Sequence, residues 1–316
     1  MRLVLTALAA SFAAASTAAA ADAPLAFSQI GAETYTEQVS VMVDLDDGTY
    51  ATATFGVSNV GPGDGKGACR FAVIDRSGKL HKGEVLVDRD AWAYDAAKKS
   101  LKIGDCVATS AGGLTLSTKT PDGNVEIRLK KNPERKRAME ANVGDDFYQL
   151  DTLLLWSDAE VTLDVAGPKR TLKGHGYADH SRSKILPSTL AKKWLRFRAV
   201  GGDDPRVMVV RFPKSGSPVG WHEAGGFGRS KVSRAQVNRR GDRWRAMVKG
   251  DKGEWRLTTT KLLQRFAPIE DRGAILGGVI KGIVGNPVTY TFRGVLEERG
   301  SKKRIPGIVE ITLTDE

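Results

Sequence analysis

With 316 residues, of which 41% are hydrophobic and 27% charged, the chain is long enough for two globular domains and too apolar for a disordered protein. After residue 21 no stretch approaches the ~18 consecutive apolar residues of a transmembrane helix, which excludes such a helix from the rest of the sequence. The net charge of +11 is compatible with an anionic partner, although a solvated basic surface without a partner is the commoner explanation of such an excess.

The N-terminus has the pattern of a cleaved secretory signal peptide. Arg2 precedes an apolar run that ends in three alanines at residues 19–21, directly before Asp22. A basic start, a short apolar stretch and small residues at its exit are features of a signal peptide; the alternative, a membrane anchor, is disfavoured because no stop-transfer charges follow. We therefore expect residues 1–21 to be removed from a periplasmic or secreted protein. Its basic surface would then contact anionic lipid headgroups or an acidic envelope polymer rather than nucleic acid.

Alternating apolar and polar residues, the period of a β-strand, dominate the remaining chain. Residues 39–45 alternate up to the turn Asp46-Asp47-Gly48, and residues 51–57 alternate after it, which predicts a hairpin. The same reasoning predicts further hairpins at residues 71–78, 114–129, 244–257 and 288–313. Short strands between glycine-bearing turns, without strand–helix alternation, indicate an all-β protein built from antiparallel barrels.

Few segments indicate helices. We predict short helices at residues 132–142 and 186–195, the second with Pro187 suited to its first turn. The apolar, Gly-rich residues 274–285 are interpreted as a lid or membrane-touching segment, with a core-packed helix as the alternative. The best domain boundary lies near Gly167-Pro168, so that the predicted domains span residues 22–168 and 169–316.

The two cysteines, Cys69 and Cys106, both lie in the part of the chain expected to be exported, where disulfides persist. A structural disulfide between them would stabilise the fold by roughly 4 kcal/mol in the chain-entropy model. A reactive thiol pair would have close C-x-x-C spacing, which is absent.

The segment GHGYADH at residues 174–180 contains half of the four histidines. On a strand, His175, Tyr177 and Asp179 share one face, while His180 points to the other. One interpretation is an acid/base site, with Asp179 tuned by burial and Tyr177 or His175 assisting. A metal site formed by His175, Asp179 and His180 is disfavoured because the histidines are split between faces and nothing supplies a fourth ligand. A structural hydrogen-bond network is the third interpretation.

Two further segments are candidates for ligand binding. On a strand, Trp194, Arg196 and Arg198 share one face, suited to gripping an anionic headgroup, although a buried Trp194 that closes a barrel base explains the pattern as well. Trp221 and His222 precede a Gly-Gly loop and are candidates for a cavity mouth. No cofactor is expected: Gly63-x-Gly65-x-x-Ala68 is followed by a strand-like segment, whereas a nucleotide site requires a helix there. No metal is expected either, for the reasons given for His175, Asp179 and His180.

Residues 174–199 resemble the two-domain lipocalin-like superfamily that includes the fungal oxidative-stress survival factors and, more distantly, carotenoid 1,2-hydratases and AttH-type proteins. The core Gly174-x-Gly176-Tyr177-x-Asp179-His180 is similar to the hydratase signature, whereas the spacing of Pro187, Ala191, Trp194 and Phe197 is more like the survival factors. Residues 37–61, 292–297 and 307–310 add to the likeness. The resemblance implies two consecutive lipocalin-like barrels that enclose apolar space. The sequence departs from the hydratases at Ser181-Arg182-Ser183, and the fungal members are intracellular.

Three functions follow as hypotheses. The first is an exported protein that carries a hydrophobic ligand such as a lipid, sterol or isoprenoid in a barrel cavity, with the side chains at 175, 177, 179, 180, 194, 196, 221 and 222 as ligand contacts. The second is a hydratase, cyclase or isomerase acting on an isoprenoid-like substrate, with Asp179 as proton donor. The third is an envelope protein whose basic patches bind an acidic polymer without a small-molecule ligand.

Overall fold

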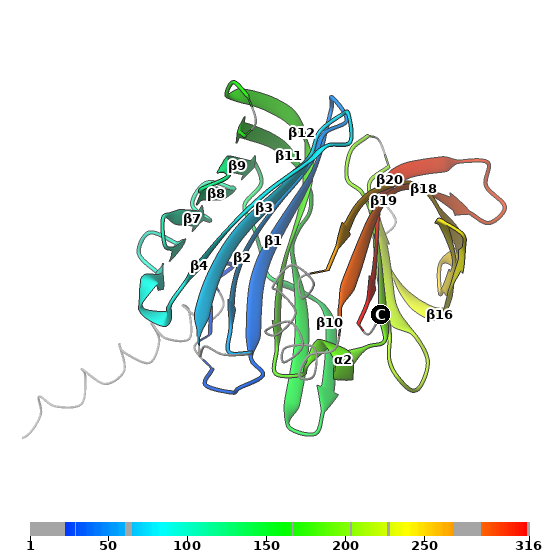
Figure 1. Ribbon diagram of the computed structural model, residues 1–316. Helices are drawn as coiled ribbons and strands as arrows, with labels where there is room; N and C mark the ends of the chain where they lie inside the picture. The colour runs from blue at the N-terminus through cyan, green and yellow to red at the C-terminus, as the bar shows by residue number, and fades with distance from the viewer. Residues whose placement is uncertain are drawn as a thin grey trace, which may run out of the picture.

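The structure is a computed structural model that describes residues 23–28, 30–60, 65–165, 167–202, 204–225, 228–267 and 286–314. Two antiparallel β-barrels stand side by side, the first in blue to green and the second in green to red (Figure 1). The expected all-β fold is confirmed. In the part of the chain that is described, no helix combines the length and apolar character needed to cross a membrane. The predicted signal peptide and the segment 274–285 lie outside the described residues.

The first barrel is a nearly closed, twelve-stranded sheet in the order β4-β3-β2-β1-β12-β11-β9-β8-β7-β6-β5, with β10 paired to β11. A single 3₁₀ turn (η1, Arg89–Ala91) precedes β5. The strands are β1 (Thr36–Leu45), β2 (Tyr50–Ser58), β3 (Lys66–Ile74), β4 (Leu80–Val87), β5 (Trp92–Asp95), β6 (Ser100–Ile103), β7 (Cys106–Thr109), β8 (Leu114–Thr120), β9 (Gly123–Leu129), β10 (Lys136–Val143), β11 (Asp146–Asp164) and β12 (Arg170–Ser183).

The second barrel is closed and eight-stranded, with each strand paired to the next and β20 paired back to β13. A four-residue helix, α2 (Pro187–Leu190), connects the barrels and has its proline in the first turn as predicted. It is shorter than the predicted helix at residues 186–195, because β13 begins at Lys193 and pairs with β14 and β20. The strands are β13 (Lys193–Ala199), β14 (Arg206–Phe212), β15 (Val219–Ala224), β16 (Gly228–Arg240), β17 (Arg243–Gly250), β18 (Gly253–Phe266), β19 (Val288–Glu298) and β20 (Arg304–Leu313).

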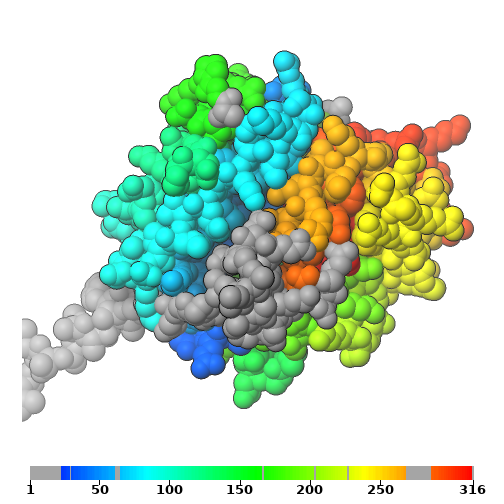
Figure 2. All heavy atoms as spheres, in the orientation of Figure 1, coloured from blue at the N-terminus to red at the C-terminus, as the bar shows by residue number. Residues whose placement is uncertain are grey.

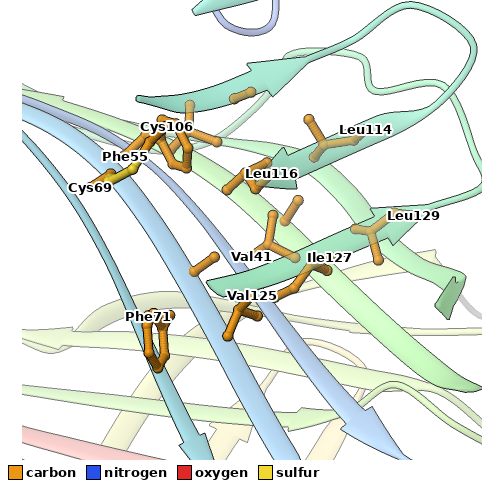
Figure 3. Packing of buried hydrophobic residues seen from close by; sticks show 14 of the residues in the cluster. Val41, Phe55, Cys69, Phe71, Cys106, Leu114, Leu116, Val125, Ile127 and Leu129 are labelled. Atoms are coloured by element: carbon orange, nitrogen blue, oxygen red, sulfur yellow. A yellow bond between two sulfur atoms is a disulfide. The ribbon is translucent and has the colours of Figure 1, made fainter. Parts of the chain in front are cut away.

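Both barrels are filled by the alternating side chains that the sequence analysis identified. In the first, the inward residues of β1 and β2, such as Val41 and Phe55, pack against Leu116 and Ile127 from β8 and β9 (Figure 3). The predicted disulfide joins Cys69 on β3 to Cys106 on β7 across this barrel. In the second, residues such as Phe197, Val248 and Val309 form a separate buried cluster. Burial of apolar side chains at ~25 cal/mol per Å² makes these two cores the main source of stability.

Two expectations about the chain's organisation differ from the structure. β12 pairs with β1 and β11 and completes the first sheet, so the second barrel begins with β13 at Lys193 rather than at the boundary expected near residue 168. Residues 132–142 were expected to be helical, but β10 occupies residues 136–143 and pairs with β11. Backbone pairing with the long neighbouring strand outweighs the helical preference of its charged residues.

Candidate functional site

A buried polar layer lies between the two barrels, formed by their outer faces. On β12 the even-numbered residues, such as Ala178, point into the first barrel, so Tyr177 and Asp179 point outward to the second. On β13 the odd-numbered residue Phe197 fills the second barrel, which directs Arg198 outward to the first. The strand periods thus bring an acid, a phenol and a cation together from two domains.

Arg198 is the centre of this layer. Its Nη1 donates to Glu310 Oε2 of β20 at 2.6 Å, and its Nη2 lies 4.0 Å from Asp179 Oδ2. The guanidinium carbon stands 4.9 Å from the centre of the Tyr177 ring, over its face. Only 3% of the Arg198 side chain is exposed, so water screens its charge very little and its interactions with nearby groups are strong. One buried cation therefore serves two carboxyl groups and an aromatic ring.

The two carboxyl groups differ in their pKa. Burial raises the pKa of Asp179 above its ordinary value, and the opposing charges of Arg198 and Arg196 do not offset it. Burial acts in the same direction on Glu310, but there the nearby guanidinium of Arg198 and the charge of Arg196 outweigh it and lower the pKa. Burial also raises the pKa of Tyr177, and the charge of Asp179 adds to this. The environment therefore favours the carboxylate form of Glu310, whereas it shifts Asp179 toward its neutral acid.

Several polar atoms in this layer have no well-formed hydrogen bond within the described part of the chain. They are the buried hydroxyl groups of Tyr177 and Tyr50 and Nε of Arg198, although the Tyr177 hydroxyl is close enough to Asp179 to influence the pKa of that carboxyl. A buried donor without a partner costs about 1–3 kcal/mol, so native proteins rarely keep several in one place without a function. Of these three residues, Tyr50 lines the large cavity described next, where its hydroxyl can meet a bound molecule or water, whereas Tyr177 and Arg198 are not among the residues of the cavity wall.

A cavity of about 820 Å³ opens between the barrels beside this layer. Figure 2 looks onto the side where the cyan strands of the first barrel meet the orange strands of the second. Tyr50 and Glu310 belong both to the cavity wall and to the buried polar layer. The remaining wall mixes apolar and polar side chains, including those of Phe71, Phe266 and Thr291. We had expected a cavity inside a barrel with an apolar lining; this one lies between the barrels and is partly polar.

The structure separates the residues of the GHGYADH segment as the strand period requires. His180 points into the first barrel, where it contacts Glu37 at 2.7 Å and the carbonyl of Pro24 at 3.0 Å. His175 shares the face of Tyr177 and Asp179 but sits at a half-exposed position, 3.6 Å from Asp158. Among the described residues, no group of three or more His, Cys, Asp or Glu side chains is arranged to hold a metal ion.

The other predicted ligand contacts fall into two groups. Trp194 and Trp221 are buried in an apolar cluster between the barrels, and Arg196 stacks on Trp194 with its guanidinium carbon 5.2 Å from the ring centre. These three belong to the surroundings of the buried polar layer. His222 lies elsewhere, against Trp255 at the wall of a separate cavity of about 80 Å³, where burial lowers its pKa to about 4.

The sequence analysis did not identify Glu310 and Tyr50 as site residues, and it assigned Arg198 to an anionic headgroup rather than to buried carboxyl groups. Glu310 stands alone as an acidic residue between Val309 and Ile311, both buried in the second barrel, which places it on the outer face. That signal was present in the sequence. The partner surface that buries Glu310 was not, because β13, β20 and β12 meet only in the tertiary structure.

Two consecutive antiparallel β-barrels give the molecule a two-barrel, lipocalin-like fold. Comparison with solved structures supports this. The chain is similar to an AttH-type protein from Nitrosomonas europaea, with a TM-score of 0.63 and 14% identity over 90% of this chain and 94% of that one. It is also similar to kievitone hydratase from Nectria haematococca, with a TM-score of 0.60 and 9% identity over 92% and 93% of the two chains.

A third similar structure is CghA with Sch210972, at a TM-score of 0.53 and 11% identity over 90% of this chain and 89% of that one. At such identities the likeness concerns the fold alone. The sequence itself matches no protein-family profile and no curated protein. None of the three structures is a fungal survival factor, so that finer part of the resemblance stays a prediction.

Proposed function

We propose that the protein is an enzyme of the hydratase, cyclase or isomerase type that moves a proton on a small molecule bound between the barrels. The observation that carries the proposal is the pair of buried carboxyl groups around Arg198, with the pKa of Asp179 raised and that of Glu310 lowered. Two groups whose environments push their pKa values apart supply an acid and a base at the same pH. The likeness in fold to a hydratase supports the same assignment.

The chemistry can be written with these residues alone. In a hydration, the Asp179 carboxylic acid donates its proton to one alkene carbon, and water adds through its oxygen to the neighbouring carbon. The added water then loses a proton to the Glu310 carboxylate, and proton exchange through solvent resets both carboxyl groups. In a cyclisation or isomerisation no water is added, and Glu310 takes the proton from a substrate carbon instead. The Tyr177 hydroxyl is close enough to Asp179 to donate to its carboxylate as it forms.

The experiment is turnover of a panel of isoprenoid and phenolic alkenes in heavy water, followed by mass spectrometry. Hydration appears as the gain of one water, and isomerisation or cyclisation as deuterium incorporation. We expect Asp179→Asn to lower turnover by about 10²–10⁴-fold, the usual contribution of a general acid. Asp158→Asn is the matched control, because Asp158 is exposed and lies on the neighbouring strand β11. Turnover unchanged in Asp179→Asn would exclude the assignment.

Carriage of a hydrophobic ligand is the second candidate function, favoured by the volume of the cavity between the barrels. Native mass spectrometry of freshly purified protein separates the two. A co-purifying lipid or isoprenoid that stays chemically unchanged on incubation supports a carrier, whereas a product that forms only with Asp179 intact supports the enzyme.

We also propose that the protein is exported to the periplasm or the medium. The apolar N-terminus and the disulfide support this proposal. It is tested by determining the N-terminal residue of the protein in each cell fraction.

A further inference from the structure

The outer face of the second barrel carries a concentration of cations that the proposed enzyme does not use. Outward-pointing side chains on two neighbouring strands, β16 and β17, form a surface that we call the basic face. All of its members are exposed: Arg234, Arg240, Arg243, Arg245 and Lys249.

Across β16 and β17 these cations are placed against one another; only Lys249 also has a carboxyl residue opposite it, Glu254 on β18. Arg240 pairs in register with Arg243, and Arg234 with Lys249. Like charges on directly opposed residues destabilise a sheet, so the pattern does not serve folding. Within the described part of the chain, none of the five basic-face side chains forms an ion pair.

The acidic residues nearby are engaged elsewhere or lie at the rim. Glu254 is bound by Arg299, and Glu297 by Arg256. Asp251, in the turn after β17, accepts hydrogen bonds from the hydroxyl and backbone groups of β16. Asp242 lies in the exposed turn at the other end of the hairpin. The basic face therefore keeps a net positive field toward solvent.

The location of the basic face leaves the site between the barrels free. In the ring of eight strands, β17 is diametrically opposite β13, which carries Arg198 toward the first barrel. The yellow strands accordingly form the outer edge of the molecule, away from the first barrel (Figures 1 and 2). Met247, on the same face of β17, is 40% exposed and adds an apolar side chain in the middle of the cations.

We propose that the basic face docks the protein on an anionic lipid bilayer. A broad, open array of cations matches an extended negative surface, because each exposed Lys or Arg near such a surface adds to the attraction. The exposed methionine side chain enters the headgroup region, where an apolar group is favoured over water. Docked in this way, the enzyme or carrier would collect or release an amphipathic ligand at the membrane. The docking itself does not depend on which of these functions is right.

The test is flotation of the full-length protein with vesicles of phosphatidylcholine alone and of phosphatidylcholine with phosphatidylglycerol. The basic-face variant is R243Q/R245Q/K249Q. A matched control, K102Q/K119Q/K169Q, removes the same charge from exposed positions on the first barrel. All proteins share the same N-terminus, so any membrane affinity of that segment cancels.

We expect binding to the anionic vesicles only, a loss of at least tenfold in affinity for the basic-face variant, and little change for the control. Binding should also weaken steeply between 0.1 M and 0.5 M salt, since the Debye length falls over that range. Equal binding to both kinds of vesicle, or equal loss in the two variants, overturns the proposal. So does binding to a soluble acidic polysaccharide without binding to vesicles, which would assign the face to an envelope polymer.

Discussion

The guanidinium of Arg198 is shared unequally between two buried carboxyl groups. It lies 2.6 Å from Glu310 and 4.0 Å from Asp179, so its charge favours ionisation of the nearer carboxyl more strongly. Burial alone would raise the pKa of both groups. The difference in distance therefore shifts the pKa values of two similar carboxyl groups in opposite directions.

Glu310→Gln should destabilise the protein at neutral pH. The lowered pKa of Glu310 in the folded state means that its carboxylate contributes stability above its ordinary pKa of 4.5, and that this contribution is lost as the pH falls. The variant also leaves Arg198 without its nearer partner, which costs about 3–5 kcal/mol. Urea unfolding at pH 7 and at pH 4 measures both. If the loss of unfolding free energy in the variant were no smaller at pH 4 than at pH 7, the lowered pKa of Glu310 would be contradicted.

Asp179→Asn should have the opposite effect on stability while it removes activity. Because the pKa of Asp179 is raised by folding, its contribution is fully present below the ordinary value of 3.8 and is lost as the pH rises. Asparagine does not ionise, so the variant should be more stable than the natural protein at pH 7, by on the order of 1 kcal/mol. The gain should vanish in acid. Lower stability of the variant at pH 7 would mean that folding does not raise the pKa of Asp179.

The sequence predicts on which face of a strand each site residue lies, but not whether that face is buried. Alternation alone assigns Tyr177 and Asp179 to one face and His180 to the other, and the structure has them so. The same alternation places Arg198 on an outer face. It does not state that an outer face is buried, because exposure of that face is the ordinary outcome for a barrel. The association of two outer faces is what makes the site.

At the scale of elements, the packing of β12 explains the Gly-x-Gly pattern at Gly174 and Gly176. A Cβ atom at Gly174 would lie 2.3 Å from the backbone oxygen of Asp44 on β1, and one at Gly176 would lie 2.6 Å from a methyl group of Leu129. Both glycines thus allow β12 to approach its neighbours closely. Their role is structural, and it fixes the position of the strand that carries Tyr177 and Asp179.

The two faces of β12 can be tested with its two histidines. His180→Ala should lower the free energy of unfolding by about 3–5 kcal/mol, because it leaves the buried Glu37 carboxyl without its histidine partner. His175→Ala is the matched variant at a half-exposed position and should change it by no more than about 0.5 kcal/mol. Thermal unfolding followed by circular dichroism measures both. Equal losses would show that the two faces are not distinguished in this way.

β10 shows where local pattern fails. Its residues alternate poorly, and only Met139 is buried. Such a segment has no period of its own to identify it as a strand. It becomes one because β11 is nineteen residues long and offers unpaired backbone groups beyond the edge of β9. The hairpins predicted from alternation and glycine turns needed no such help, and those at residues 39–57 and 288–313 are present.

At the scale of the whole molecule, the two barrels are joined by a shared apolar cluster as well as by the polar layer. Tyr148 and Leu150 of the first barrel pack with Trp194, Val209 and Trp221 of the second. These side chains lie on outer faces, where a separate barrel would expose them to water. Folding of either barrel therefore stabilises the other, and unfolding should be cooperative across both.

The disulfide provides a test of that cooperativity. Cys69 and Cys106 are 37 residues apart within the first barrel, so replacing both with alanine should lower the free energy of unfolding by about 4 kcal/mol. If the shared cluster couples the barrels, calorimetry should show one transition shifted down by roughly 5–10 °C, rather than an early transition of the first barrel alone. Two separated peaks, with the later one unshifted, would show independent barrels. The site between them would then be formed by docking and not by folding, because Asp179 and Arg198 come from different barrels.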